Sequence, residues 1–394
     1  MKKRRAPGLD TRAVHAGKLS DPSGALADPI FQTAPFSFSG TDALARAASG
    51  EPPDAFYTRE GNPNWRAAET KLALLEGAED AVLFGSGMGA ISTAFLAHLK
   101  SGDHVVATED LYGGAIRFFR EVLEPMGISF TLVKTEPEPR VEEAIRPETR
   151  WIYVESPTNP LVKIVDLEFV AAVARRRNIT AVIDGTFGSP ILQRPIELGF
   201  GLVLHSATKY LNGHADVTAG FAAGSHEMLE PIRARRTRIG AILDPHAAFL
   251  LTRGMKTVGL RVRAQSENAL LLAGFLSKSS AVERVHYPGL PSHPGHAAAR
   301  RQMSAFGAML AFDVAGALPG AHKFLSRLKL ATLATSLGSV ETTADLPWLT
   351  SHRAVSPEKK RELGIQEGTI RLSVGIEDID DLCEDLEAAL GVRG

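Results

Sequence analysis

Residues 180–209 open with Thr180-Ala181-Val182-Ile183-Asp184 and close with Leu202-Val203-Leu204-His205-Ser206-Ala207-Thr208-Lys209. Each apolar run is short and is followed at once by charged or hydroxyl side chains, which is typical of a buried strand that ends at a polar edge. The residues between the two runs leave room for one helix. A strand, a crossover and a second strand form the repeating unit of a mainly parallel sheet.

The same pattern extends on both sides of this stretch. Further short apolar runs lie at residues 81–84, 105–107, 128–133, 151–154 and 219–222, with helical spacing between several of them, as in residues 167–177. We therefore predict an α/β fold whose parallel strands are covered on both faces. In such sheets ligands bind at the carboxyl ends of the strands.

Helices and a second region complete the expected fold. Residues 65–75 have helical spacing and stop before Gly77, and residues 245–275 are predicted to form one long helix. After the breaker-rich residues 287–295 we expect a C-terminal α+β region. It ends in an alternating strand around Leu372 and in a helix with Leu382 and Leu386 one turn apart.

Composition excludes several classes of protein. The chain has 394 residues, 44% of them hydrophobic and 23% charged, with 44 Lys and Arg against 45 Asp and Glu. This balance gives no reason to expect nucleic acid or an anionic membrane as a partner. No apolar run is long enough to span a bilayer. The single cysteine, Cys383, excludes an intrachain disulfide and a thiolate metal cluster. We expect a cytoplasmic protein without a metal site.

The chain contains a cluster of basic residues. Residues 233–238 carry four arginines but no interleaved aromatic side chains. This pattern indicates a solvated helix face or a contact between subunits rather than a nucleic-acid surface.

Candidate functional side chains stand where the predicted strands stop. The glycine-rich turn at residues 85–89 either places a helix N-terminus against a phosphate or is only a tight turn. Asp184 is either a ligand or a cap, and Lys209 is either reactive or a solvated loop lysine. Tyr112 either stacks on a ligand or packs. Arg371, inside an apolar strand, is either exposed or directed into a cleft where it binds a carboxylate.

Together these side chains match the needs of one cofactor. Pyridoxal 5'-phosphate (PLP) requires a lysine for its imine, an acid to keep its ring nitrogen protonated and a phosphate cradle. It also requires an aromatic side chain over the ring, and its amino-acid substrates require a cation for their carboxylate. Lys209, Asp184, the glycine turn, Tyr112 and Arg371 supply these groups.

The sequence resembles the Cys/Met-metabolism family of PLP-dependent enzymes, the group of cystathionine γ-synthase, cystathionine γ-lyase and methionine γ-lyase. The likeness covers almost the whole chain. The matching segments are residues 57–63, 85–88, 111–114, 155–160, 206–214, 287–290, 336–338 and 371–375.

The resemblance implies a role for each matching residue. Lys209 is identified as the lysine that forms the imine and moves protons, and Asp184 as the partner of the ring nitrogen. Gly87, Met88, Ser206 and Thr208 are expected to hold the phosphate, and Asn159 the ring's phenolic oxygen. Tyr112 is expected to stack on the ring and assist proton transfer. Arg371 and Ser336 are expected to bind the substrate carboxylate.

The resemblance also implies the architecture. The fold is expected to be fold type I, similar to aspartate aminotransferase, with a mainly parallel seven-stranded sheet. Residues 1–60 are expected to form an arm whose Tyr57 and Arg59 reach the phosphate in a neighbouring subunit. Residues 61–250 would form the PLP-binding domain and residues 251–394 the small domain. The expected assembly is a homotetramer of catalytic dimers.

Departures from the family pattern bear on the reaction. Phe56 and Thr335 stand where cystathionine enzymes tend to carry acids, and Gly114 stands where methionine γ-lyases usually have cysteine. Gly185, Ala115 and Asn64 also differ from the usual residues. Gly185 and Ala115 are read either as widening the site or as drift.

We predict γ-elimination from a homoserine-derived or sulfur-containing amino acid such as cystathionine or methionine, giving a 2-oxo acid, ammonia and a thiol. The alternative is γ-replacement, as in cystathionine γ-synthase or O-acylhomoserine sulfhydrylase. A nicotinamide dehydrogenase and a cofactor-free binding scaffold are the competing classes. The glycine turn is not the dinucleotide motif, and the complete set of cofactor residues disfavours a scaffold.

Overall fold

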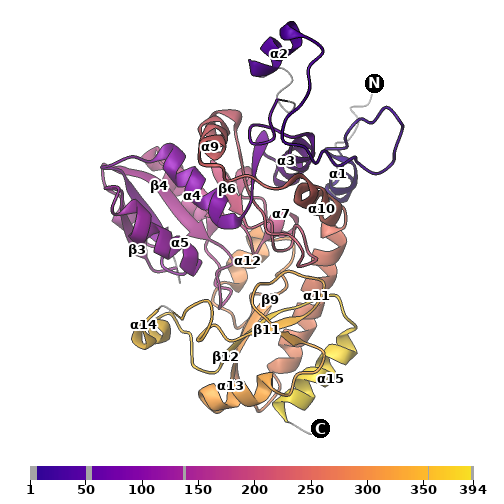
Figure 1. Cartoon of the computed structure of the whole chain (residues 1–394). Helices are drawn as coiled ribbons and strands as arrows, with labels where there is room; N and C mark the ends of the chain where they lie inside the picture. Colours follow the sequence, from indigo (N-terminus) through magenta and orange to yellow (C-terminus); the bar gives the residue numbers. More distant parts are fainter. Residues whose placement is uncertain (1–6, 50–55, 136–138, 354, 392–394) are drawn as a thin grey trace, which may run out of the picture. The chain divides into compact units, whose positions relative to one another are not determined.

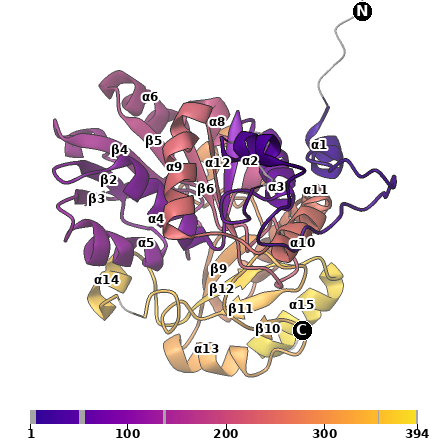
Figure 2. The same ribbon diagram turned by 45° about the horizontal axis from the view of Figure 1, so that its top comes forward.

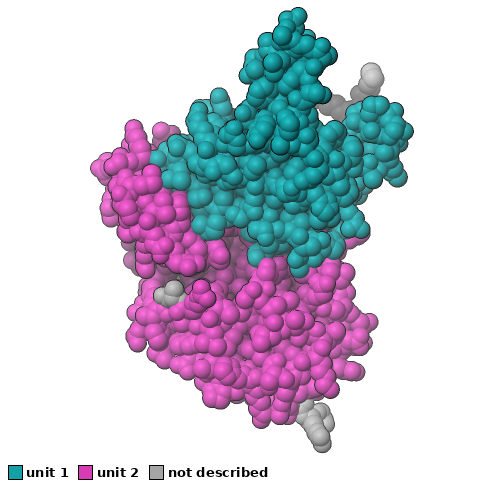
Figure 3. Space-filling view, viewed as in Figure 1, with its two compact units in different colours: residues 1–99, 201–259 teal, residues 100–200, 260–394 magenta. Residues whose placement is uncertain are grey.

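The structure, a computed structural model, describes residues 7–49, 56–135, 139–353 and 355–391. The chain divides into two compact units, which Figure 3 colours separately. Unit 1 comprises Met1–Leu99 and Gly201–Gly259, and unit 2 comprises Lys100–Phe200 and Leu260–Gly394.

Unit 1 consists of three strands and six helices among its described residues (Figure 1). The strands are β1 Asp80–Phe84, β6 Leu202–His205 and β7 Gly220–Gly224. The helices are α1 Leu9–His15, α2 Thr41–Ala48, α3 Pro63–Glu76, α4 Gly87–His98, α9 His226–Ile239 and α10 Pro245–Met255. Strand β7 pairs antiparallel with both β1 and β6. Helices α3, α4 and α9 pack against these strands.

The boundaries of α3 follow from its sequence. The side chain of Asn62 accepts a hydrogen bond from the backbone N–H of Asn64, and Pro63 occupies the first turn, where no N–H is needed. Gly77 ends the helix at φ 72°, a conformation that glycine adopts without steric cost. The predicted helix at residues 65–75 is confirmed.

Unit 2 contains two groups of strands. Its first segment holds β2 His104–Thr108, β3 Ser129–Val133, β4 Thr149–Glu155 and β5 Thr180–Asp184, which pair in parallel in the order β3-β2-β4-β5. Figure 2 shows β2, β3 and β4 side by side. The helical elements of this segment are α5 Gly113–Phe118, the π-helix Phe119–Leu123, the 3-10 helix Glu142–Ala144, α6 Leu167–Arg177, α7 Ser189–Leu192 and α8 Pro195–Leu198.

The second segment of unit 2 is an α+β region. Its strands form a five-stranded sheet in the order β10-β11-β12-β9-β8. The strands are β8 Val282–His286, β9 Met309–Val314, β10 Thr332–Leu333, β11 Thr343–Asp345 and β12 Thr369–Ser373. The helices are α11 Val258–Leu276, α12 His296–Gln302, α13 Ala317–Leu325, α14 Pro357–Glu362 and α15 Ile379–Leu390.

The C-terminal strand and helix form where the sequence predicts them. Ile370 and Leu372 of β12 and Leu382 and Leu386 of α15 are buried in one hydrophobic core. Alternate residues of a strand and every fourth residue of a helix share a face, so both patterns present an apolar surface to this core.

All seven apolar runs become strands of one seven-stranded sheet in the order β1-β7-β6-β5-β4-β2-β3. The expected α/β class, with a mainly parallel sheet and a C-terminal α+β region, is confirmed. Within the described residues, no helix is long and apolar enough to cross a membrane. The division at residues 60 and 250 stays a prediction.

The expected single helix at residues 245–275 is wrong. It is two helices, α10 and α11, interrupted at Lys256. Gly254 near the end of α10 lies so close to the segment after Lys209 that an added Cβ would stand 2.3 Å from the Asn212 carbonyl oxygen. Apolar periodicity runs through the break and does not reveal it.

The prediction that the basic cluster at residues 233–238 is a solvated helix face also needs correction. Arg233 and Arg236 on α9 both form ion pairs with Glu69, at 3.0 and 2.9 Å. Arg236 is buried and its guanidinium lies 4.8 Å from the ring centroid of Trp65. These two arginines hold α9 to α3. The expected solvated face is therefore wrong for Arg236, whereas Arg233 stays partly exposed.

Candidate active site

The glycine-rich turn of unit 1 joins β1 to α4. Ser86 caps α4, and its hydroxyl oxygen accepts a hydrogen bond of 2.9 Å from the backbone N–H of Gly89. Gly87 and Met88 are the first two residues of the helix, so their N–H groups have no acceptor within it. The turn therefore presents donors at the positive end of a 12-residue helix, an arrangement that suits a phosphate.

The segment after β6 packs closely against this turn. A Cβ added at Gly87 would stand 2.8 Å from the Cβ of Ser206, and one added at Gly220 would stand 2.1 Å from the Ser86 carbonyl oxygen. Only glycine permits this approach. The structure thus brings together three of the predicted phosphate residues, Gly87, Met88 and Ser206.

Lys209 lies in a turn that starts directly after β6. Its backbone N–H donates to the Ser206 carbonyl at 3.2 Å, and its carbonyl accepts from the Gly213 N–H at 2.8 Å. The Thr208 hydroxyl donates to the Ala219 carbonyl at 3.1 Å and accepts from the Ala219 N–H at 2.9 Å. These bonds fix the backbone on either side of the lysine side chain.

Tyr57 and Arg59 occupy a more exposed part of unit 1. Tyr57 forms a bridge with Pro35 and is 40% exposed. The Arg59 guanidinium lies 5.7 Å from the Tyr57 ring centroid and donates to the Thr237 carbonyl at 3.4 Å. The two side chains lie beside each other on an exposed surface.

Unit 2 gathers Tyr112 and Asn159 around one carboxyl group. Glu155, the last residue of β4, accepts the Tyr112 N–H at 2.7 Å on one oxygen and the Asn159 N–H at 3.0 Å on the other. Tyr112 is 44% exposed, whereas Asn159 is buried. Glu155 was not among the predicted site residues, although it begins the family segment at residues 155–160.

Asp184 ends β5 directly beside this carboxyl group. Glu155 and Asp184 are paired across the two parallel strands, so their side chains stand on the same face. Asp184 accepts the Thr186 N–H at 3.0 Å in a loop, so it does not cap a helix. Burial, and then the Asp184 charge, hold the pKa of Glu155 well above its usual value. Burial raises the pKa of Tyr153 in the same way.

Arg371 is buried, so it is not the solvent-exposed residue that was one of the two alternatives. Its binding of a substrate carboxylate stays a prediction. Its guanidinium donates to Asn159 Oδ1 at 2.8 Å, to Asp345 Oδ2 at 2.9 Å and to the Ser336 carbonyl at 3.1 Å. Ser336 has φ 76°, an uncommon conformation for a residue other than glycine. Asp345 was missed because nothing in its sequence context marks it.

These residues fit PLP by the chemistry of their donors and acceptors. Unit 1 supplies the Lys209 amine, in the turn that follows β6, and a glycine-lined helix N-terminus, where an added Cβ at Gly87 would meet Ser206. Unit 2 supplies a buried carboxylate, an exposed aromatic ring and a buried guanidinium. Each group matches one requirement of the cofactor or of its amino-acid substrate.

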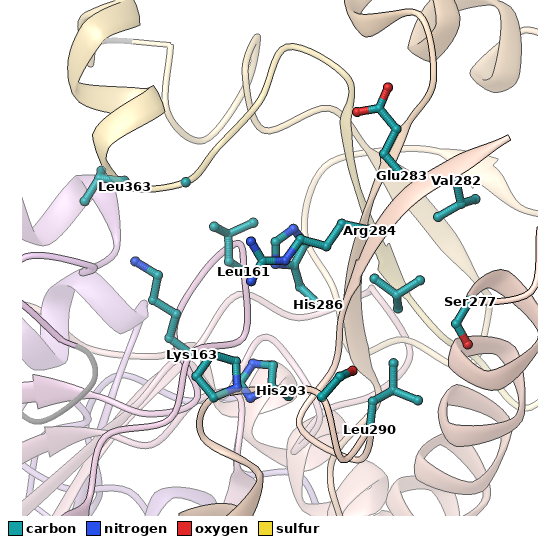
Figure 4. A pocket seen from close by; sticks show the side chains of 14 residues that line it. Leu161, Lys163, Ser277, Val282, Glu283, Arg284, His286, Leu290, His293 and Leu363 are labelled. Carbon is teal, nitrogen blue, oxygen red and sulfur yellow. The ribbon is translucent and has the colours of Figure 1, made fainter. Parts of the chain in front are cut away.

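A pocket of about 350 Å³ lies elsewhere in unit 2 (Figure 4). Lys163, Arg284 and His286 line it, but none of the predicted site residues does. Lys163 is paired with Asp110 at 2.9 Å and His286 with Asp313 at 3.0 Å. Its buried charges are thus already compensated, and we assign it no ligand.

Comparison with known proteins gives consistent results. Residues 10–391 match the family described as Cys/Met metabolism PLP-dependent enzyme. The chain is 43% identical to L-methionine gamma-lyase of Pseudomonas putida, with 98% of this chain and 97% of that protein covered. It is 44% identical to cystathionine beta-lyase of Coxiella burnetii, with 97% of each covered.

A solved structure agrees with both. Cystathionine gamma-lyase from Lactobacillus plantarum, complexed with L-serine, superposes with a TM-score of 0.91 at 37% identity, covering 98% of this chain and 99% of that one. A match of this length, together with the lysine turn and the arginine network, leads to one conclusion: the chain belongs to the Cys/Met metabolism family of PLP-dependent enzymes.

Proposed function

We propose that this protein is a carbon–sulfur lyase that uses PLP for γ-elimination from cystathionine, methionine or a similar amino acid. The products are a 2-oxo acid, ammonia and a thiol. The observation that carries the proposal is the placement of Lys209 in a fixed turn after β6, with Ser206 packed on the glycine turn at the start of α4.

The residues of unit 1 would hold the cofactor at its aldehyde and phosphate ends. Lys209 supplies the amine that binds the aldehyde, and the N–H groups of Gly87 and Met88 with the Ser206 hydroxyl bind the phosphate. The Thr208 hydroxyl proton is directed to the Ala219 carbonyl in this structure. Thr208 would therefore rotate its proton away from Ala219 to bind the phosphate.

Residues of unit 2 would orient the ring and the substrate. Asp184 would keep a proton on the ring nitrogen, Asn159 would contact the phenolic oxygen, and Tyr112 would stack on the ring. Arg371 binds the substrate carboxylate. It is held by Asp345 and by the Ser336 carbonyl, so its position is set before substrate arrives.

PLP, when bound, supplies an electron sink for the negative charge that develops at the substrate Cα. Lys209, once its amine is free, would take the Cα proton and pass it to the cofactor, and only then could it accept a Cβ proton. Tyr112 or Lys209 donates a proton to the departing γ substituent. Lys209 must be uncharged when it accepts a proton and charged when it donates one.

The choice of γ-elimination over γ-replacement is supported by the names of the relatives. Phe56, whose ring lies 6.0 Å from that of Phe38, bears on the substrate and favours methionine over cystathionine. An apolar ring there cannot pair with a distal ammonium group. The test is a product screen with cystathionine, methionine, homocysteine and O-acylhomoserines, with and without sulfide or cysteine. Thioether formation with negligible 2-oxo acid would favour replacement and contradict the proposal.

We also propose that residues 1–60 act as an arm in a homotetramer of catalytic dimers, beside the domains at 61–250 and 251–394. Support comes from exposed apolar side chains in this segment, such as Leu26 at 85% and Val14 at 44%. Tyr57 and Arg59 would complete the phosphate site of the neighbouring subunit. The single free cysteine, Cys383, supports a reducing, cytoplasmic location.

A hybrid experiment tests the arm. Lys209→Ala and Arg59→Ala subunits are inactive or weak alone, but their mixed dimer would contain one site with both Lys209 and Arg59 intact. We expect mixing after mild dissociation to restore activity. If Arg59 served its own subunit, no hybrid would regain activity, and light scattering of the mixture verifies that dimers form.

A further inference from the structure

Glu155 has no role among the site residues predicted from the sequence. Glu155 is 4% exposed, and each of its two carboxyl oxygens accepts a backbone N–H. The donors, Tyr112 and Asn159, are separated from each other by the whole of β3 and β4. A single buried carboxyl group therefore ties the loop after β2 to the loop after β4.

Both tied residues have roles in the proposed function. Tyr112 is the N-cap residue of α5, so a shift of its backbone moves the ring that would cover the cofactor. Asn159 binds Arg371 through Oδ1 at 2.8 Å, so its position also affects the group proposed for the substrate carboxylate. Glu155 is thus hydrogen-bonded to both Tyr112 and Asn159, and through Asn159 it is linked to Arg371.

The surroundings of Glu155 favour its neutral form. Asp184 is its direct partner on β5, and Asp110, also buried, adds a further negative charge. Lys163 pairs with Asp110 and not with Glu155. Two carboxyl groups this close do not both ionise without a large cost, and the two N–H donors offset only part of it.

We propose that Glu155 is a positioning residue: it holds Tyr112 and Asn159 in place for the cofactor ring and leaves the negative charge of the Glu155–Asp184 pair on Asp184. The proposal rests on the proposed function, because it assigns Asp184 to the ring nitrogen. Glu155 itself touches neither cofactor nor substrate. Its effect is transmitted through two hydrogen bonds and one neighbouring charge.

The test uses the full-length protein loaded with PLP and two variants, Glu155→Gln and Glu155→Ala. Gln is neutral and isosteric and can accept only one of the two N–H groups, whereas Ala accepts neither. The matched control is Asp313→Asn, which changes a buried carboxyl group bonded to His286 and Thr369 in the same unit. Visible circular dichroism reports the ring orientation independently of activity.

We expect Glu155→Gln to lower the visible dichroism per bound cofactor and to reduce kcat about 10-fold with KM nearly unchanged, and Glu155→Ala to reduce kcat about 100-fold. Asp313→Asn should change only the free energy of unfolding. If Glu155→Ala does not fold, the visible dichroism and kcat of Glu155→Gln still test the positioning role. Wild-type dichroism and kcat in Glu155→Gln would overturn the positioning role.

A pH titration of the cofactor absorbance tests the charge assignment. Because Gln mimics a neutral Glu155, the midpoint in Glu155→Gln should stay within about 0.3 pH units of wild type, whereas Asp184→Asn should move it by about 1 unit or more. A shift of that size in Glu155→Gln would place the charge on Glu155 and overturn the assignment. A wild-type protein that binds no PLP would instead refute the proposed function itself.

Discussion

The two units build their candidate site residues in different ways. In unit 1 the predicted residues other than Tyr57 and Arg59 belong to two continuous segments, the turn at residues 85–89 and the turn at residues 206–209, and their contacts are mainly backbone hydrogen bonds and glycine approaches. In unit 2 the predicted residues depend on polar and charged side chains distant in sequence, such as Asn159 and Arg371. The arrangement in unit 1 is local, so it can be predicted from the sequence. The arrangement in unit 2 joins residues distant along the chain, so it can be seen only in the folded protein.

The comparison predicts that the largest single effect lies in unit 1. Lys209→Ala should abolish the near-violet absorbance formed with PLP and lower kcat/KM by about 1000-fold or more, because no other group replaces the reactive amine. Absorbance and steady-state kinetics measure both effects. The matched control is Lys163→Ala, which removes a lysine paired with Asp110 and should keep the absorbance. Unchanged turnover in Lys209→Ala would refute the assignment.

In unit 2 the largest effect is expected at Arg371. Arg371→Lys loses the planar fork that contacts Asn159, Asp345 and the Ser336 carbonyl, so KM should rise about 100-fold with a smaller change in kcat. Asp345→Asn should raise KM less. Kinetics with the amino acid and with its decarboxylated amine measure this. An equal loss for both compounds would contradict a role in carboxylate binding.

A smaller effect, on PLP affinity, is expected when a side chain is added at Gly87 in unit 1. Gly87→Ala places a Cβ 2.8 Å from that of Ser206, so the two segments must separate and PLP should bind about 10-fold more weakly. Gly274→Ala, in α11, meets open space and should leave binding unchanged. Equilibrium titration with PLP measures the dissociation constants. Wild-type affinity in Gly87→Ala would show that the cradle lies elsewhere.

The smallest expected effect concerns acid stability of unit 2. Burial, followed by the Arg371 charge, lowers the pKa of His352 to about 4, and burial lowers that of His293 to about 4. The unfolded chain binds these protons near the usual pKa of 6.5, so it holds more protons between pH 6.5 and 4. The free energy of unfolding therefore falls as the pH drops through this range.

Urea unfolding at two pH values measures this dependence. Between about pH 7.5 and pH 5.5 each histidine should lower the free energy of unfolding by about 1 kcal/mol. His352→Gln should lose less stability than wild type over that interval. His246, which is exposed, provides the control variant His246→Gln. An identical pH dependence in His352→Gln and wild type would show that His352 binds protons equally in the folded and unfolded states, and would contradict the lowered pKa.

Much of the fold was predictable because its signals are local. Seven apolar runs became seven strands, since a buried parallel strand needs apolar residues on both faces. The break between α10 and α11 was not predictable, because it accompanies the contact of Gly254 with Asn212. The ion pairs of Arg233 and Arg236, and the burial of Arg236, were missed for the same reason: their partner Glu69 lies on another helix.

The sequence by itself determined the seven strands of the large sheet, the glycine turn, the lysine turn and the family. These depend on short-range steric preference and on residue types within a few positions of one another. Tertiary structure alone decided that Arg371 is buried between Asp345 and Asn159, and that Glu155 ties Tyr112 to Asn159 beside Asp184. Such contacts join residues distant along the chain, and their strength depends on burial, which only the folded chain defines.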